Sequence, residues 1–282
     1  MKITPLAFDS MGTRSMATYV KTSDVGIVID PGVALAPKRY DLPPHPKEIE
    51  RMQEQWNDIK KKAAESDILI VTHYHFDHHN PNEESIYQGK IAMLKDPKHN
   101  INKSQAGRSQ AFLENLGTLS GRPKEVIYTD GKEFLYGNTK IRFSPPMTHG
   151  LHDRLGYVTE VLVDDGDSRF IHTSDVLGPC TKEQTDYVIK ENPQVAFIDG
   201  PMYFTIREAV SNLKRIIDES EIEKIVIDHH LLRDAKWREK IAEVFREAER
   251  EGDTKIMTAA EFLGRENDLL EARRKYLWKS GT

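Results

Sequence analysis

The chain has 282 residues, 38% hydrophobic and 30% charged, with a formal net charge of −5. This composition is too apolar for a disordered chain, and no apolar run approaches the ~20 residues that span a bilayer. The single cysteine, Cys180, excludes an intramolecular disulfide and a cysteine-based zinc finger. The first residues contain no apolar stretch of signal-peptide length, so we expect a cytoplasmic protein without a membrane segment.

Short apolar runs and turn residues alternate in the first third of the chain. We expect strands at 2–8, 15–20 and 25–29, the last of them ending at Asp30-Pro31-Gly32. A helix is expected at 48–64, and a buried strand at 68–71 leads directly into a histidine-rich loop. Residues 80–124 form a longer insertion, in which we expect one helix at about 104–116.

The second half continues as strands and then as alternating helices and strands. Strands are expected at 125–128, 139–144, 157–163, 168–172, 195–199 and 225–228, and helices from about 181, at 205–219 and at 235–250. Thr258 to Glu261 is a capping box that opens a last helical segment. The pattern predicts one domain over residues 1–282, with an insertion at about 80–124, a helical C-terminal segment at about 235–282, and two sheets with helices outside them.

The loop after the strand at 68–71 carries the most specific motif of the chain. It has the pattern H-x-H-x-D-H, formed by His73, His75, Asp77 and His78. Imidazole and carboxylate side chains together suit Zn, Fe or Mn. Four such residues within six positions exceed the needs of one metal ion and are about right for starting two neighbouring sites.

Three later positions offer further ligands, because each follows a predicted strand. They are His149, Asp175 and the pair His229-His230. Each alone is typical of a turn residue, but their order after the H-x-H-x-D-H run favours a shared metal centre.

With these motifs in this order, the chain resembles a metallo-β-lactamase-fold hydrolase, and its Asp30-Pro31-Gly32 and histidine runs resemble an uncharacterised archaeal-type group of that superfamily. The resemblance implies an α/β fold, an αβ/βα four-layer sandwich of two mixed β-sheets flanked by helices. It implies two divalent metal ions, with Zn as the first expectation and Fe or Mn as alternatives. It places His73, His75 and His149 on the first metal, and Asp77, His78 and the last histidine on the second. Asp175 and a hydroxide would bridge the two ions, and Asp30 would orient the histidine loop.

The last ligand is open between two adjacent histidines. His229 is the first choice because it directly follows the strand and Asp228, and His230 is the alternative. His79 and His172 are expected outside the ligand set, and Cys180 as a packing residue. Arg233 is expected in a surface pair or a helix cap.

The ligand set predicts a hydrolase that needs no nucleophilic side chain, with Asp77 and Asp175 as its catalytic carboxylates. Residues 90–124 hold seven basic and two acidic side chains, which favours a small anionic substrate such as a phosphodiester or another phosphorylated molecule, although a solvated surface segment has the same composition. Nucleic acid stays open as a partner, although the net charge does not indicate it. The alternatives are a thioester, ester or lactone hydrolase and a non-catalytic metal-binding protein. The sequence does not indicate an oligomeric state.

Overall fold

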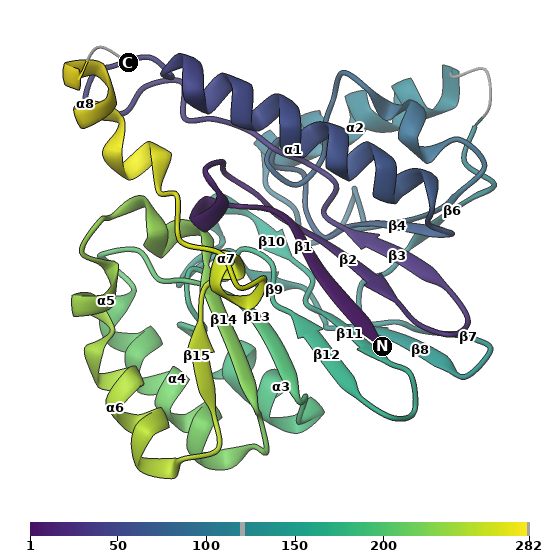
Figure 1. The fold of residues 1–282 in the computed structure, drawn as a ribbon. Coiled ribbons are helices and arrows are strands. Elements are labelled where there is room, and N and C mark those ends of the chain that lie inside the picture. The colour runs from purple at the N-terminus through teal and green to yellow at the C-terminus, as the bar shows by residue number, and fades with distance from the viewer. Residues whose placement is uncertain (119–121, 281–282) are drawn as a thin grey trace.

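Two mixed β-sheets face each other in the computed structural model, which describes residues 1–118 and 122–280 (Figure 1). The N-terminal sheet has six strands in chain order: β1 (Lys2–Phe8), β2 (Met16–Lys21), β3 (Gly26–Ile29), β4 (Ile68–Val71), β5 (Ile91–Leu94) and β6 (Glu125–Tyr128). Its first three strands are antiparallel, and β3 to β6 are parallel.

The C-terminal sheet has seven strands in the order β15-β14-β13-β12-β11-β8-β7. They are β7 (Glu133–Tyr136), β8 (Thr139–Phe143), β11 (Val161–Asp164), β12 (Arg169–His172), β13 (Val195–Asp199), β14 (Lys224–Asp228) and β15 (Lys255–Met257). Strands β12 to β15 pair in parallel, and β7, β8, β11 and β12 pair antiparallel. A separate two-stranded ribbon joins β9 (Met147–Thr148) and β10 (Tyr157–Val158).

Helices cover the outer face of each sheet. Helices α1 (Pro46–Ala64) and α2 (Lys103–Thr118) lie over the N-terminal sheet, while α3 (Lys182–Glu191), α4 (Ile206–Glu219) and α6 (Ala242–Glu251) lie over the C-terminal one (Figure 1). Shorter helices follow in the last quarter of the chain: α5 (Trp237–Lys240), α7 (Ala259–Phe262) and α8 (Leu270–Ser280).

Three apolar clusters hold these layers together. One packs α1 and α2 against the N-terminal sheet, and another packs α3, α4 and α6 against the C-terminal sheet. The third lies between the sheets and contains Phe8 and Ile27 from one and Phe170 and Phe197 from the other. The expected four-layer αβ/βα sandwich is thereby confirmed.

Several predicted elements differ from those observed. Part of the predicted insertion at 80–124 is β5, which pairs with β4 and β6 inside the sheet. Residues 119–121 of that insertion lie outside the described residues. The strand predicted at 157–163 is two strands, and the helix predicted at 235–250 is divided into α5 and α6 at Ile241. The C-terminal segment, of which residues 281–282 are not described, also contains β15.

Within the described residues, every helix is too short or too polar to cross a membrane.

Candidate metal centre

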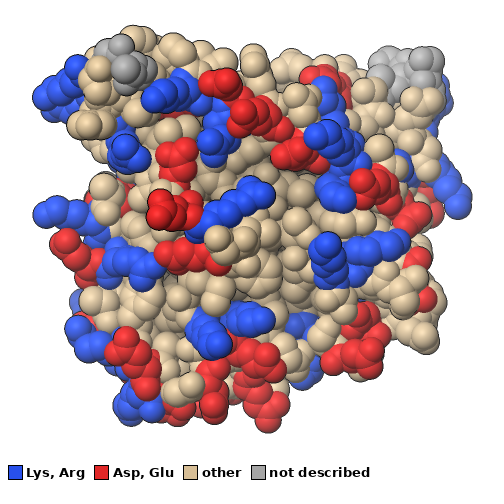
Figure 2. Space-filling view, viewed as in Figure 1, with Lys and Arg blue, Asp and Glu red and all other residues tan. Residues whose placement is uncertain are grey.

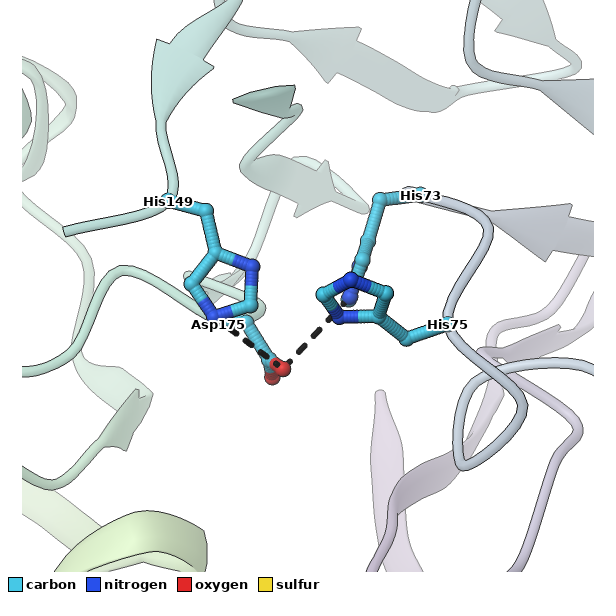
Figure 3. A group of neighbouring side chains, drawn as sticks. All are labelled: His73, His75, His149 and Asp175. Atoms are coloured by element: carbon cyan, nitrogen blue, oxygen red, sulfur yellow. Dashed lines mark ion pairs between the residues drawn. The ribbon is translucent and has the colours of Figure 1, made fainter. Parts of the chain in front are cut away.

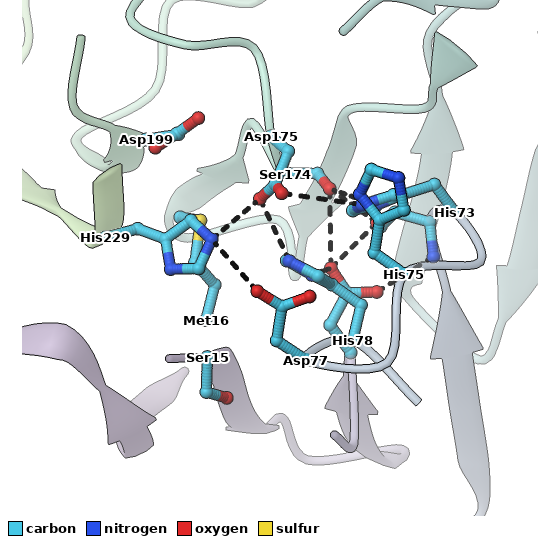
Figure 4. A network of polar contacts seen from close by, with 12 residues as sticks. Ser15, Met16, His73, His75, Asp77, His78, Ser174, Asp175, Asp199 and His229 are labelled. Carbon is cyan, nitrogen blue, oxygen red and sulfur yellow. Dashed lines mark hydrogen bonds and ion pairs between the residues drawn. The ribbon is translucent and has the colours of Figure 1, made fainter. Parts of the chain in front are cut away.

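The side chains predicted as metal ligands come from four loops, each at the end of a strand. The H-x-H-x-D-H loop follows β4, His149 follows β9, Asp175 lies beyond β12, and His229 follows β14. Figure 4 shows the loops that carry His73 to His78, Asp175 and His229 converging on one place. Parallel pairing of β12, β13 and β14 explains part of this convergence, because it brings the C-terminal ends of these strands to one edge of the sheet.

The first group of donors consists of His73, His75, His149 and Asp175, whose donor atoms all lie within 4.8 Å of one another (Figure 3). Oδ2 of Asp175 lies 3.5 Å from Nε2 of His73 and 3.7 Å from Nε2 of His149. Three imidazoles and one carboxylate oxygen therefore surround one point.

The second group consists of Asp77, His78 and His229, again within 4.8 Å. The other oxygen of Asp175, Oδ1, lies 3.0 Å from Nε2 of His78 and 3.4 Å from Nε2 of His229. Nε2 of His229 lies 3.7 Å from Oδ2 of Asp77. Asp175 thus presents one oxygen to each group, which is the arrangement of a bridging carboxylate.

Two buried carboxylates orient the histidines of the second group. Asp30 accepts a hydrogen bond from Nδ1 of His78 at 2.8 Å, and Asp9 accepts one from Nδ1 of His229 at 2.7 Å. Thr72 donates to Asp30 from its backbone N–H and its hydroxyl. With Nδ1 engaged in this way, Nε2 of each imidazole is directed at the centre, as in metal-binding histidines generally.

The charges around Asp30 favour its ionised form. Burial alone would raise the pKa of this carboxyl, but His78, with which it forms a hydrogen bond, and the nearby His172 and His73 outweigh burial and lower the pKa below its ordinary value. Asp30 is therefore a carboxylate at neutral pH, able to accept both the Thr72 and His78 hydrogen bonds.

Several buried donor atoms of this cluster have no hydrogen-bond partner among the described residues. They are Nε2 of His73, Nε2 of His78, both ring nitrogens of His149 and Oδ1 of Asp175, all buried. A buried polar atom without a hydrogen-bond partner costs about 1–3 kcal/mol, so several at one point fit a site that binds a ligand. Nitrogen and carboxylate donors of this kind fit divalent transition metals, and two donor groups sharing Asp175 fit two ions.

Three residues in these loops have unusual backbone conformations. Asp30, Ser174 and His229 have positive φ values of 51°, 55° and 63°, a region that non-glycine residues occupy at a cost. Gly32 is required for a different reason: a Cβ there would lie 2.3 Å from the backbone N of His79, so only glycine lets the β3 loop pack against the histidine loop.

The adjacent histidines His229 and His230 have separate positions. His229 shares the second donor group with Asp77 and His78. A carboxylate holds Nδ1 of each histidine, Asp9 that of His229 at 2.7 Å and Asp199 that of His230 at 2.9 Å. A donor atom of His230 still lies within 4.8 Å of donor atoms of Asp175 and His229, so it borders the centre. His229 belongs to both of these groups and His230 only to the one with Asp175, so His229 as the last ligand stays a prediction with His230 as the alternative.

Two residues of the site, Asp9 and Arg233, were not predicted from the sequence to belong to it. Arg233, expected at the surface, is only 11% exposed and donates from Nε to Asp9 at 3.0 Å. Its other end lies 3.7 Å from Oδ2 of Asp77, so it brings a positive charge to the second donor group. Asp9 lies 220 residues from the histidine it contacts, and no local pattern marks it as part of the site.

The basic side chains of residues 90–124 have mixed roles. Nζ of Lys90 donates to the backbone carbonyls of Ala64 and Ser66 at the end of α1. Lys95 is fully buried in an ion pair with Asp130. At least these two charges serve the fold and are not available to a ligand.

The residues expected outside the ligand set are buried. Nδ1 of His79 contacts the backbone oxygen of His75 at 3.0 Å, and Nε2 of His172 contacts that of Met16 at 2.9 Å. Cys180 is buried, its thiol donates to the backbone carbonyl of Val176 at 3.4 Å, and burial raises the pKa of the thiol to about 12. A protonated, enclosed thiol is consistent with a packing role.

Comparison with known proteins places this geometry in a family. The model of the metallo-beta-lactamase superfamily matches residues 12–230. A UPF0282 protein of Korarchaeum cryptofilum is 46% identical over 99% of this chain and 95% of its own length. The solved metallo-beta-lactamase fold protein YhfI from Bacillus subtilis superposes with a TM-score of 0.57 at 12% identity, covering 94% of this chain and 96% of its own. An isothiocyanate hydrolase from Delia radicum gut bacteria superposes with a TM-score of 0.52 at 16% identity, and the match covers 92% of this chain and 95% of the hydrolase chain.

Proposed function

The chain belongs to the metallo-beta-lactamase superfamily and, within it, to the archaeal UPF0282 proteins, and from this premise we propose that it is a binuclear metal-dependent hydrolase of small phosphodiesters. The observation that carries the proposal is the position of Asp175, whose two oxygens face two separate groups of histidines. Two ions held in these groups would lower the pKa of a water molecule between them and polarise the bond to be cleaved.

The protein's own residues would supply orientation and charge. Asp30 and Asp9 fix His78 and His229 in the orientation that directs Nε2 inward. Burial would raise the pKa of Asp77, but His78, His229 and Arg233 outweigh it and lower the pKa. Asp77 is therefore ionised at neutral pH, which suits a ligand and also a group that holds a proton briefly during hydrolysis.

A small anionic substrate is favoured over a polymer. Arg233 adds a fixed positive charge beside Asp77 and His229. Over the face drawn in Figure 2, Lys and Arg side chains alternate with Asp and Glu, and the described residues of that face form no broad field of one sign. Nucleic-acid backbones are bound mainly by such cationic fields. We therefore propose a phosphodiester or phosphorylated small molecule as the substrate.

The test is hydrolysis of bis(p-nitrophenyl) phosphate by protein reconstituted with Zn, Mn or Fe. Changes around metal-bound residues typically cost 10- to 100-fold, so we expect Asp175→Ala, which removes the shared carboxylate, to lower the rate by about 100-fold or more and to reduce the bound metal. Asp218→Asn, a surface carboxylate, is the matched control and should keep the wild-type rate.

A parallel assay with an acyl thioester distinguishes the alternative chemistry. Hydrolysis of the thioester without hydrolysis of the phosphodiester would contradict the phosphodiester proposal and favour a thioester, ester or lactone hydrolase. Two bound metals with no turnover in either assay would favour a metal-binding protein without catalysis.

A further inference from the structure

A pocket of about 580 Å³ adjoins the metal centre, and His149 forms part of its wall. Two loops enclose it: residues 150–156, which follow His149, and residues 200–205, which lead from β13 into α4. Its apolar lining consists of Leu151, Leu155, Leu177, Met202, Tyr203 and Phe204. A pocket of this size accommodates a ring-bearing small molecule, and its contact with His149 places such a molecule beside the reacting bond.

The aromatic residues of this pocket are unusually exposed. Tyr203 is 78% exposed and Phe204 is 46% exposed, and their rings meet edge to face with centroids 5.2 Å apart. Leu155, on the opposite loop, is 39% exposed. Contiguous apolar side chains left in water mark binding sites more often than isolated ones, and aromatic rings pack well against other rings.

A side-chain hydrogen bond ties each of the two loops to a neighbouring segment. The hydroxyl of Thr205 donates to the carbonyl of Leu177 at 2.7 Å, which anchors the loop that carries Tyr203 and Phe204. On the other side, Gln105 of α2 donates to the carbonyl of Leu155 at 2.8 Å. Gly156, with φ of 95°, permits this contact, since a Cβ there would lie 2.6 Å from Nε2 of Gln105. A preformed pocket does not spend binding energy on ordering its walls.

We propose that this pocket binds an aromatic ring of the substrate, which makes the substrate a phosphodiester with an aryl or nucleobase group. The inference rests on the proposed function, because the metal centre would take the phosphoryl group. Besides His149, the polar side chains of the pocket are His152 and Arg154, which are both exposed. Each can stack on a ring or donate to its polar edge, so the lining suits a ring with polar substituents better than an alkyl chain.

The experiment measures binding of two probes that differ only in the ring. Phenylphosphonate and methylphosphonate carry the same charged head, and their dissociation constants for the metal-loaded protein are obtained by calorimetry. We expect phenylphosphonate to bind about tenfold more tightly, equivalent to about 1.4 kcal/mol. The double variant Tyr203→Ala/Phe204→Ala should reduce that preference to about twofold or less while binding methylphosphonate as the wild type does.

A matched control separates this pocket from exposed aromatics in general. Tyr276 on α8 is 63% exposed and does not line the pocket, so Tyr276→Ala should retain the phenyl preference. Equal affinities for the two probes, no binding of phenylphosphonate, or an unchanged preference in the double variant would each overturn the inference.

The same experiment separates this inference from the proposed function. A phenyl preference that depends on Tyr203 and Phe204, in a protein that hydrolyses no phosphodiester, would support the ring pocket and contradict the reaction. Hydrolysis of phosphodiesters without any phenyl preference would support the proposed reaction and contradict the ring pocket. Uridine 5′-monophosphate identifies the source of the ring: tighter binding than phenylphosphonate indicates a nucleoside, and weaker binding indicates a simple aryl ester.

Discussion

Glu160 is a buried carboxyl group that the metal centre does not use. It lies between β10 and β11, is fully buried, and neither side-chain oxygen has a hydrogen-bond partner among the described residues. Burial raises its pKa well above the ordinary value of 4.5. The folded protein therefore keeps the proton on Glu160 at a pH where the unfolded chain has released it.

This difference predicts a pH-dependent loss of stability. Below about pH 4.5 both states bind the proton, and above it only the folded state does, so the free energy of unfolding falls by about 1.4 kcal/mol per pH unit until the folded-state pKa is reached. Glu160→Gln has no proton to lose. The variant should gain stability relative to the wild type as the pH rises from 5 to 7, measured by urea unfolding in excess chelator.

The comparison between variant and wild type cancels the other groups that titrate in this range. Glu183→Gln, at an exposed position on α3, controls for the loss of a carboxylate. If the difference between Glu160→Gln and the wild type stayed constant across pH 5–7, Glu160 would be ionised in the folded state and our assignment of its proton would be wrong.

At the residue scale, the local sequence predicted the candidate ligands but not the residues that form hydrogen bonds to them. His73, His75, Asp77 and His78 lie within six positions, and such density has few structural explanations. Asp9 and Arg233 are of residue types that usually lie at the protein surface. Their roles arise only when β1 and the loop after β14 meet, and nothing within a few positions of either records that contact.

At the scale of elements, α8 is attached to the body of the protein by a buried ion pair. Arg274 donates from Nε and from a terminal nitrogen to the two carboxylate oxygens of Glu48 on α1, each at 2.8 Å. Both side chains are fully buried. The remaining donor of Arg274 binds the backbone oxygens of Ala36 and Leu42, so one side chain joins α8, α1 and the irregular segment that precedes α1.

Removal of one member of this pair should be costly. Arg274→Ala leaves the Glu48 carboxylate buried without its cation, and we expect it to lower the free energy of unfolding by about 3–5 kcal/mol. Arg273→Ala, on the same helix but 49% exposed, should change it by no more than about 0.5 kcal/mol. Urea unfolding of both variants gives the comparison, and a similar small effect for the two would show that α8 contributes little to stability.

The elements predicted correctly are those whose own sequence is decisive. Residues 68–71 form a continuous apolar run, and α1 has both a charged face and a capping box at His45 and Glu48. Strand β5, by contrast, is four residues of mixed propensity, Ile91 to Leu94, and becomes a strand because β4 and β6 lie on either side of it. Pairing across a sheet is a tertiary effect that overrides weak local preference.

For the whole molecule, the candidate metal centre lies where the two halves of the sandwich meet. The histidine loop after β4 belongs to the N-terminal sheet, whereas Asp175 and His229 follow strands of the C-terminal sheet. Ions bound here would link the two halves, and without them Nε2 of His73, Nε2 of His78 and both ring nitrogens of His149 have no hydrogen-bond partner among the described residues. Metal should therefore stabilise the fold as well as serve the reaction.

We expect chelation to lower the melting temperature and Zn to restore it. A ligand that binds only the folded state adds about 4 kcal/mol when its free concentration is about 1,000 times its dissociation constant. For a domain larger than 250 residues, each kcal/mol corresponds to about 2 °C, so the shift should be near 8 °C or less. Calorimetric scans of the chelated and the Zn-loaded protein provide the measurement.

Two variants determine whether the shift comes from this centre. Asp175→Ala should melt at the same temperature with and without Zn, because it removes the carboxylate that both donor groups share. The carboxylates of Asp218 on α4 and of Glu247 and Glu251 on α6 also lie within 4.8 Å of one another and could collect ions without linking the sheets. If Glu251→Gln abolished the Zn-dependent shift and Asp175→Ala preserved it, the stabilising ion would be at the surface, and the cluster between the sheets would hold together without metal.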